Sequence, residues 1–233
     1  MRLDKYLCQA TSLTRSQAKK IIVSSRVKIG TKEATSVVVN PAFKVSETHQ
    51  VLLDGEVISA LGNRYIVLNK PAGYICSTID ELYPSALRLV SAAGKSNLHF
   101  AGRLDQDTTG LVLISDDGDW THRVTSPKSL CAKTYRVWLA EALSAQAQDS
   151  LEQGVLLKNE SKITRPAHIQ VVTPQQVLLT IREGKYHQVK RMFAAVGNKV
   201  EKLHRESIGE ITLENLQESQ WRELNPTEIV SFK

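Results

Sequence analysis

The stretch GRLDQDTTG, residues 102–110, leads directly into the apolar run LVLI, residues 111–114. Glycines, an arginine and two aspartates immediately before an uncharged run predict a loop held against a buried strand, because glycine permits tight turns and such loops carry functional side chains. Asp105 and Asp107 are therefore candidate catalytic groups. A purely structural interpretation makes both of them turn residues with Arg103 as a local ion-pair partner.

The same loop contains the pattern Asp-x-Asp-x-Thr over residues 105–109, which is typical of magnesium-dependent phosphatases that form an aspartyl phosphate. That nucleophile loop follows a hydrophobic parallel strand, whereas the residues before Asp105, LHFAGR, are polar and broken by glycine. The aspartates further along the chain, Asp116, Asp117 and Asp119, are expected to cap the next helix rather than to bind a metal. The sequence thus predicts no metal site.

Length and composition describe an ordinary globular protein. The 233 residues are 42% hydrophobic and 23% charged, which allows one large domain or a small one followed by a medium one and excludes disorder and coiled coil. The apolar runs are too short to span a bilayer and the first residues lack a signal-peptide core, so a cytoplasmic protein is expected. The cysteines Cys8, Cys76 and Cys131 are far apart and odd in number, which predicts buried thiols rather than disulfides or zinc ligands.

Two common hydrolase motifs do not occur in the sequence. Gly94-Lys95-Ser96 looks like the end of a phosphate-binding loop, but Leu89 stands where its first glycine is needed. The six histidines contain no HExxH pattern and share no metal-ligand spacing. Nucleotide hydrolysis and zinc-dependent hydrolysis are therefore unsupported.

Positive charge is concentrated near the N-terminus. Residues 1–32 carry eight basic side chains and one acidic one, a formal charge of +7, whereas the whole chain carries +6. A short basic module on a nearly neutral body is typical of a nucleic-acid tether, because lysine and arginine neutralise phosphates and release counterions. The alternative is a solvated helix face without a partner. Residues 182–205 form a second basic segment, with a formal charge of +5.

The N-terminal residues predict two short helices and a small sheet. Leu3 and Leu7 lie on one helical face, a second helix begins after Thr14 as N-cap, and period-two patterns indicate strands near 27–29, 37–39 and 51–53. The segments RLDKYL and TRSQAKKIIVSSRVKIG resemble the S4-like RNA-binding module, whose helices present basic side chains to folded RNA. The resemblance implies RNA contacts by Arg2, Lys5, Arg15, Lys19, Lys20, Arg26 and Lys28.

The remaining sequence predicts an α+β domain. Small and polar residues at 59–63 suggest a linker, which separates an S4-like α/β domain over 1–58 from a second domain over 64–233. Apolar and alternating stretches predict strands, and the segments between them predict helices, around a mixed and largely antiparallel sheet. The predicted strands are 65–68, 111–114, 133–139, 168–172 and 176–182, and the predicted helices lie near 84–93, 118–125, 143–153 and 187–197.

The extended string GRLDQDTTGLVLISDDG resembles the signature loop of RNA pseudouridine synthases. Three further segments agree with that family in order and spacing: NKPAGY at 69–74, KTY at 133–135 and EGKYHQVKRM at 183–192. The S4-like head and the HQVKRM form of the last motif indicate the RsuA family, which modifies ribosomal RNA. The resemblance spans residues 64–209 and implies a catalytic domain in which Asp105 is the essential residue.

The resemblance also implies roles for other side chains. Lys190 would pair with the Asp105 carboxylate, and Tyr135 would stack on the uracil that is flipped out of the RNA. Arg103 would contact phosphate, with His187 and Arg191 as further RNA contacts. Asp105 would act either as a nucleophile at the ribose or as a base that removes a sugar proton, and the sequence leaves both open. The isomerisation involves no redox change, so no cofactor is expected.

The opening MRLDK and the compact length point within the family to the small-subunit enzymes, whose implied target is uridine 516 of 16S rRNA. Two alternatives stay open: a large-subunit rRNA target with the same chemistry, and a non-catalytic RNA-binding or ribosome-assembly factor. The expected partner is ribosomal RNA. A monomer is expected, because the sequence contains no apolar repeat or zipper.

Overall fold

The computed structural model describes residues 1–11, 13–30, 34–46, 48–60, 62–91 and 98–232. The chain divides into two compact units, one containing Met1–Asn63 and the other containing Arg64–Val90 and His99–Lys233. Leu61 of the predicted linker and Lys32 of the basic N-terminal segment lie outside the described residues. The same holds for Gly94-Lys95-Ser96, the segment that looks like the end of a phosphate-binding loop. Among the described helices, none is long and apolar enough to cross a membrane.

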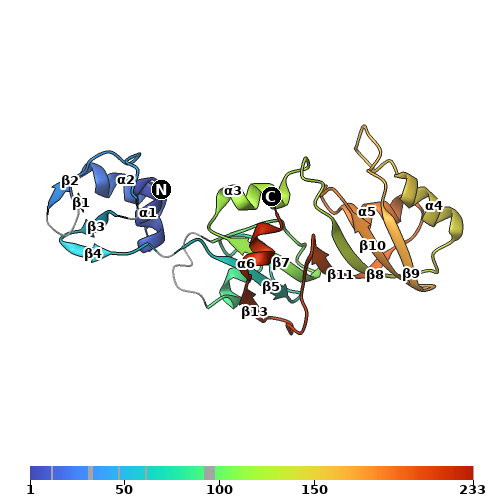
Figure 1. Ribbon diagram of the computed structural model, residues 1–233. Coiled ribbons are helices and arrows are strands. Elements are labelled where there is room, and N and C mark those ends of the chain that lie inside the picture. The colour runs from blue at the N-terminus through green and yellow to red at the C-terminus, as the bar shows by residue number, and fades with distance from the viewer. Residues whose placement is uncertain (12, 31–33, 47, 61, 92–97, 233) are drawn as a thin grey trace. The chain divides into compact units, whose positions relative to one another are not determined.

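In the N-terminal unit, two helices pack on a small sheet (Figure 1). They are α1 (Leu3–Ala10) and α2 (Arg15–Val23). Thr14 is the N-cap of α2, as the sequence predicts, and it forms a capping box with Gln17. Leu3, Leu7, Ala18 and Ile22 are fully buried, which confirms the predicted apolar faces.

The sheet of this unit is antiparallel, with the strand order β2-β1-β3-β4. Its strands are β1 (Val27–Gly30), β2 (Thr35–Val37), β3 (Gln50–Leu53) and β4 (Glu56–Ile58). Strand β2 begins and ends earlier than the predicted 37–39, because Val37 is the last residue paired with β1 in its ladder. Strand β4 was missed by the sequence pattern.

The second unit is built on a nine-stranded sheet, with the main order β13-β5-β7-β11-β8-β10-β9. Every pair is antiparallel except β7 with β11, so the predicted α+β class with a mixed, largely antiparallel sheet is confirmed. The strands are β5 (Tyr65–Lys70), β6 (His99–Phe100), β7 (Thr109–Ser115), β8 (Lys133–Leu139), β9 (His168–Thr173), β10 (Gln176–Ile181), β11 (Val200–Ile208), β12 (Ile211–Thr212) and β13 (Trp221–Glu223).

Strand β7, which follows the loop of residues 102–108, is buried along its whole length. Figure 1 shows α3 (Gly118–Thr125) and α6 (Pro226–Val230) near the β5–β7 part of the sheet, and α4 (Ala145–Gln153) and α5 (Gln188–Ala195) near the β8–β10 part. Trp120 of α3 packs edge-on against Tyr65 and Phe232 and donates a hydrogen bond to the carbonyl of Ile229. Because β7 is fully buried, the loop of residues 102–108 that precedes it is anchored to the core of the unit.

Two sequence expectations need correction. The helix predicted near 84–93 is only a short 3-10 helix, η1 (Ala86–Leu89), because Ser85 caps its start and Val90 is already extended. Strand β11 was not predicted, although it lies at the centre of the sheet. Its ladder with β8 shifts register twice, and each bulge breaks the alternation of inward and outward side chains by which a strand is recognised.

Candidate active site

The loop of residues 102–108 is held by its backbone on several sides. Gly102 adopts a φ of +94°, which only glycine tolerates readily, and the Thr108 amide donates to the Asp105 carbonyl at 3.1 Å. The Gly73 amide donates to the Gln106 carbonyl at 3.0 Å. These bonds fix the direction in which the Asp105 side chain leaves the loop.

Lys70, from the NKP motif, links two loops through hydrogen bonds from its side chain. Its ammonium donates to the carbonyls of Pro71 at 2.9 Å, Tyr74 at 2.8 Å and Gln106 at 3.4 Å, and the residue is fully buried. Burial lowers the pKa of Lys70, against the opposing charges of the thiol and carboxylates around it. Lys70 thus acts as an internal clamp between the turn at 71–74 and the Asp105 loop.

The Asp105 carboxylate lies between two nitrogen groups of the HQVKRM motif. His187 Nε2 is 3.3 Å from Oδ1 of Asp105, and Lys190 Nζ is 3.3 Å from its Oδ2. Lys190 also contacts Oδ1 of Asp107 at 2.6 Å. The pairing of Lys190 with Asp105, an expectation from the family resemblance, is therefore a contact in this structure.

Lys190 and Asp107 shift each other's protonation. Burial alone would lower the pKa of Lys190, but the hydrogen bond to Asp107 and the charges of Asp105 and Asp107 raise it above the ordinary lysine value. Burial would likewise raise the pKa of Asp107, but the hydrogen bond and charge of Lys190 bring it below the ordinary carboxyl value. Lys190 therefore stays a cation beside Asp105.

The start of α5 gives these groups their position. His187 stands at the N-cap with a φ of 47°, a left-handed conformation uncommon for any residue other than glycine. Val189, Met192 and Phe193 bury one face of α5, so Lys190 is left on the face toward Asp105. The strained N-cap and the buried helix face together hold His187 and Lys190 over the carboxylate.

A cavity of about 470 Å3 opens at this carboxylate. Arg103, Asp105, Tyr135, His187 and Lys190 all line it, which brings together side chains far apart in the sequence. Tyr135 lies on β8 and is 8% exposed. A cavity of this size, lined by carboxylates, tyrosine rings and several cations, suits a flipped nucleotide rather than an extended apolar ligand.

Other predicted contacts are placed differently. Arg103 is exposed, and its guanidinium makes no ion pair with any described residue. Arg191 does not line the cavity: it pairs with Glu160 at 3.3 Å and donates to the carbonyls of Lys158 and Tyr186. The Tyr186 ring is 71% exposed and stacks on His187 at 3.8 Å between centroids.

The predicted RNA contacts of the N-terminal unit fall into two groups. Arg2 and Arg15 pair with the buried Asp4 at 2.9 and 3.4 Å, and Arg26 pairs with Asp54 at 2.5 Å. The lysines have no ion pair within the described part of the chain. They are Lys5, which is half-buried, and the exposed Lys19, Lys20 and Lys28.

Arg205 lines the cavity as well, although its sequence context indicates only that it belongs to the basic segment 182–205. It lies on the unpredicted strand β11, where its backbone pairs with Gly110 and Tyr135. Its neighbours His204, Glu206 and Ser207 are polar, so the sequence offered no sign that Arg205 is buried. The bulges of β11 hide the strand pattern that would have shown it pointing inward.

The structure offers no support for the phosphatase interpretation. The strand before the loop, β6, has two residues and is antiparallel to β7, and Asp107 is paired with Lys190. Asp117 caps α3 by accepting from the amides of Asp119 and Trp120, as predicted, and Asp116 pairs with Arg64. Within the described residues, no group of three or more His, Cys, Asp or Glu is arranged to hold a metal.

Comparison with known proteins agrees with this geometry. Residues 64–195 match the family model of RNA pseudouridylate synthases, and residues 1–51 match the S4 domain. The chain belongs to the RNA pseudouridylate synthase family. The predicted family and the predicted S4-like head are both confirmed, and the chain is an isomerase.

Relatives match over the full length. The ribosomal small subunit pseudouridine synthase A of Vibrio parahaemolyticus is 53% identical over 99% of this chain and 99% of its own. The protein of the same name from Escherichia coli strain K12 is 48% identical, again over 99% of both chains. A crystal structure of a pseudouridylate synthase is 42% identical, covers 100% of both chains and gives a TM-score of 0.71.

Proposed function

We propose that this protein converts one uridine of small-subunit ribosomal RNA, uridine 516 of 16S rRNA, to pseudouridine. The observation that carries the chemistry is the meeting of Asp105, Tyr135 and Lys190 at one cavity. The target is supported by relatives named for the small subunit that are 48–53% identical over nearly the whole chain. The N-terminal unit is the RNA tether, and the protein works as a monomer.

The reaction breaks the bond between N1 of uracil and C1′ of ribose, turns the base and joins C1′ to C5. Asp105 acts at the ribose, as a nucleophile at C1′ or as the base that removes a sugar proton. Lys190 pairs with this carboxylate at 3.3 Å and holds it in position for the ribose. No electrons are exchanged with another molecule, so the reaction needs no redox cofactor.

The target uridine leaves its stack to enter the cavity, at a cost of a few kcal/mol. The ring of Tyr135 stacks on the base and offsets part of the stacking energy lost from the RNA. The exposed Arg103 at the cavity rim binds a backbone phosphate, and His187 with the stacked Tyr186 contacts the strand beside the flipped nucleotide. Exposed lysines of the N-terminal unit supply affinity that does not depend on sequence.

The test is tritium release from 5-tritiated uridine in unmodified rRNA, because the C5 hydrogen must leave in this reaction. Small-subunit and large-subunit rRNA are each offered as fragment and as assembled particle. We expect release from small-subunit RNA only, and a loss of more than about 10³-fold in Asp105→Asn, with RNA binding retained. Asp119→Asn, an exposed aspartate in the first turn of α3, is the matched control and keeps full turnover.

The other outcomes separate the alternatives. Release from large-subunit RNA alone would keep the chemistry and overturn the target. No release from any RNA, with binding intact, would favour a non-catalytic binding or assembly factor. Full turnover by Asp105→Asn would overturn the assignment of the catalytic residue.

A further inference from the structure

Arg205 occupies the junction of the two strands that frame the cavity. On β11 it lies opposite Gly110 of β7 and opposite Tyr135 of β8. A side chain at Gly110 would bring its Cβ to 2.4 Å from the Arg205 carbonyl oxygen, so the two backbones pass at a distance only glycine allows. The position of Arg205 relative to the Asp105 loop is therefore fixed.

The guanidinium of Arg205 joins three parts of the site. Its Nε donates to the Leu111 carbonyl at 2.7 Å, and its Nη1 donates to the Arg103 carbonyl at 3.3 Å and to the Tyr135 hydroxyl at 3.4 Å. The loop that carries Asp105 and the strand that carries Tyr135 are thus linked through one side chain.

Arg205 is also a buried cation without a counter-ion. The residue is 1% exposed, its Nη2 has no hydrogen-bond partner, and no carboxylate among the described residues forms an ion pair with it. Such a charge is costly to keep in a protein interior. The cost is understandable if negative charge forms in the adjoining cavity during the reaction.

We propose that Arg205 is a positioning residue for departure of the base: it orients Tyr135 and stabilises the uracil anion electrostatically. The inference rests on the proposed function. As the C1′–N1 bond breaks, its electron pair leaves with uracil, and the carbonyl oxygens share the charge. The new C1′–C5 bond then forms from that electron pair, and the proton lost at C5 is balanced by the one gained at N1.

The hydrogen bond from Arg205 to Tyr135 has a direction that matters. The phenol oxygen accepts from Nη1, so the single hydroxyl proton of Tyr135 is left to point elsewhere. Both residues line the same cavity, and an oxygen that accepts from a cation becomes a stronger donor. Tyr135 is thereby prepared to donate to a carbonyl oxygen of the departing base.

The test compares uridine with 5-fluorouridine at the target position, under single-turnover conditions, by digesting the RNA and measuring the remaining nucleoside. Fluorine withdraws electrons and stabilises the base anion without help from the protein. For Arg205→Gln we expect a rate loss of about 100-fold with uridine and at most about tenfold with 5-fluorouridine. An equal loss with both substrates would overturn the proposal.

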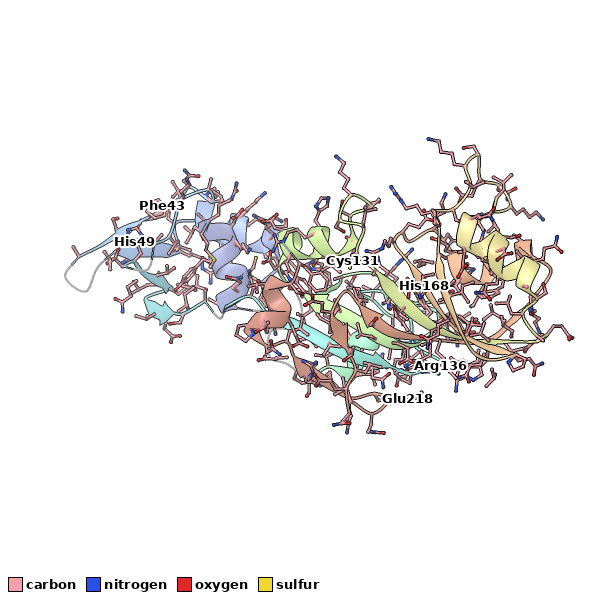
Figure 2. All side chains as sticks on the ribbon, turned by 45° about the vertical axis from the view of Figure 1, so that its right-hand side comes forward. Phe43, His49, Cys131, Arg136, His168 and Glu218 are labelled. Carbon is pink, nitrogen blue, oxygen red and sulfur yellow. The ribbon has the colours of Figure 1, made fainter. Side chains whose placement is uncertain are left out.

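A second measurement separates orientation of Tyr135 from mere support of the fold. In a Tyr135→Phe background, Arg205→Gln is expected to cost less than about tenfold, because part of its effect passes through the missing hydroxyl. A loss as large as in the wild-type background would contradict this. Arg136 lies on the same strand as Tyr135 and is labelled in Figure 2. It pairs with Glu206, and Arg136→Gln is the matched control that retains the wild-type rate.

Folding and function are kept apart in this design. Thermal unfolding of each variant is recorded, and if Arg205→Gln does not fold, Arg205→Lys replaces it. Lysine keeps the charge but lacks the planar guanidinium, so we expect a smaller rate loss that is still greater with uridine than with 5-fluorouridine. An equal rate loss with both substrates overturns the proposal. If the wild type acts on neither the uridine RNA nor the 5-fluorouridine RNA, the proposed function is refuted. If the wild type is active and the variants lose rate equally with both RNAs, only this inference is refuted.

Discussion

In the N-terminal unit, Arg2 and Arg15 share the single negative charge of the buried Asp4, and the lysines predicted to contact RNA lie apart, with no ion pair among the described residues. In the second unit, Lys190 and His187 converge on Asp105, and the uncompensated Arg205 lies within the same cavity wall. Scattered charge contributes to RNA affinity in small and additive steps. Converging charge changes the chemistry of one carboxylate. Mutations in the two units should therefore differ in kind as well as in size.

The largest effect in this comparison, after loss of Asp105 itself, is expected from Lys190→Met. Removing the cation that lies 3.3 Å from the Asp105 carboxylate should slow the single-turnover rate about 100-fold and leave the RNA dissociation constant unchanged. Lys199→Met, which removes an exposed lysine paired with Glu201, is the control. Weakened RNA binding at an unchanged rate would show that Lys190 belongs with the tethering charges.

A smaller effect, of another kind, is expected from the double variant Lys19→Gln and Lys20→Gln. RNA affinity should fall about tenfold, and the salt dependence of binding should lose about one counterion per lysine. The rate at saturating enzyme should not change. The neutral pair Arg88→Gln with Asp80→Asn removes an exposed ion pair but no net charge, and it should leave the salt slope as it is.

The buried Asp4 is predicted to affect stability rather than activity. Its carboxylate is 0% exposed and accepts from Arg2, Arg15 and the Lys5 amide. Asp4→Asn should destabilise the N-terminal unit by about 1 kcal/mol, measured by denaturant unfolding. Burial opposes its charge, but the two arginines outweigh that and lower the pKa of Asp4. The difference from wild type should accordingly vanish as the pH falls through this lowered value.

The smallest effect concerns the pair of the exposed Asp107 and the half-buried Lys190. Because the pKa of Asp107 is lowered and that of Lys190 is raised, the pair stabilises the fold between the ordinary carboxyl and lysine values, about 4 and about 10.4. The contribution is lost in acid as Asp107 is protonated and in base as Lys190 is deprotonated. With the Asp107 side chain 63% exposed, Asp107→Asn should cost less than about 1 kcal/mol at neutral pH, measured by thermal unfolding. A constant difference at every pH would refute the pairing.

Much of this arrangement follows from local sequence. The capping box at Thr14, the cap at Asp117 and the alternation of β8 are decided within a few residues, and the structure has each of them. The meeting of Asp105 with Lys190 was expected only because a family resemblance links segments more than eighty residues apart. The hydrophobic periodicity of the sequence does not predict that contact.

Other features could not be predicted, for physical reasons. Strand β11 has two bulges, so its side chains do not alternate regularly. The sequence therefore indicates only a basic segment at Arg205 and not a buried side chain. The local sequence does not distinguish Lys70 from an exposed lysine, because the three carbonyl oxygens that accept from its ammonium are set by the fold. The left-handed N-cap at His187 is strain stored by tertiary packing, which a propensity scale does not contain.

The most direct test of this division of labour measures binding and chemistry on the same samples. The RNA dissociation constant and the single-turnover release of tritium from 5-tritiated uridine, at saturating enzyme, are determined for Asp105→Asn and for the Lys19→Gln, Lys20→Gln variant. We predict a crossing: Asp105→Asn binds as wild type and releases tritium more than about 10³-fold more slowly, whereas the lysine variant binds about tenfold more weakly and releases it at the wild-type rate. Tritium release by Asp105→Asn near the wild-type rate, or a slow reaction by saturated lysine variant, would contradict it.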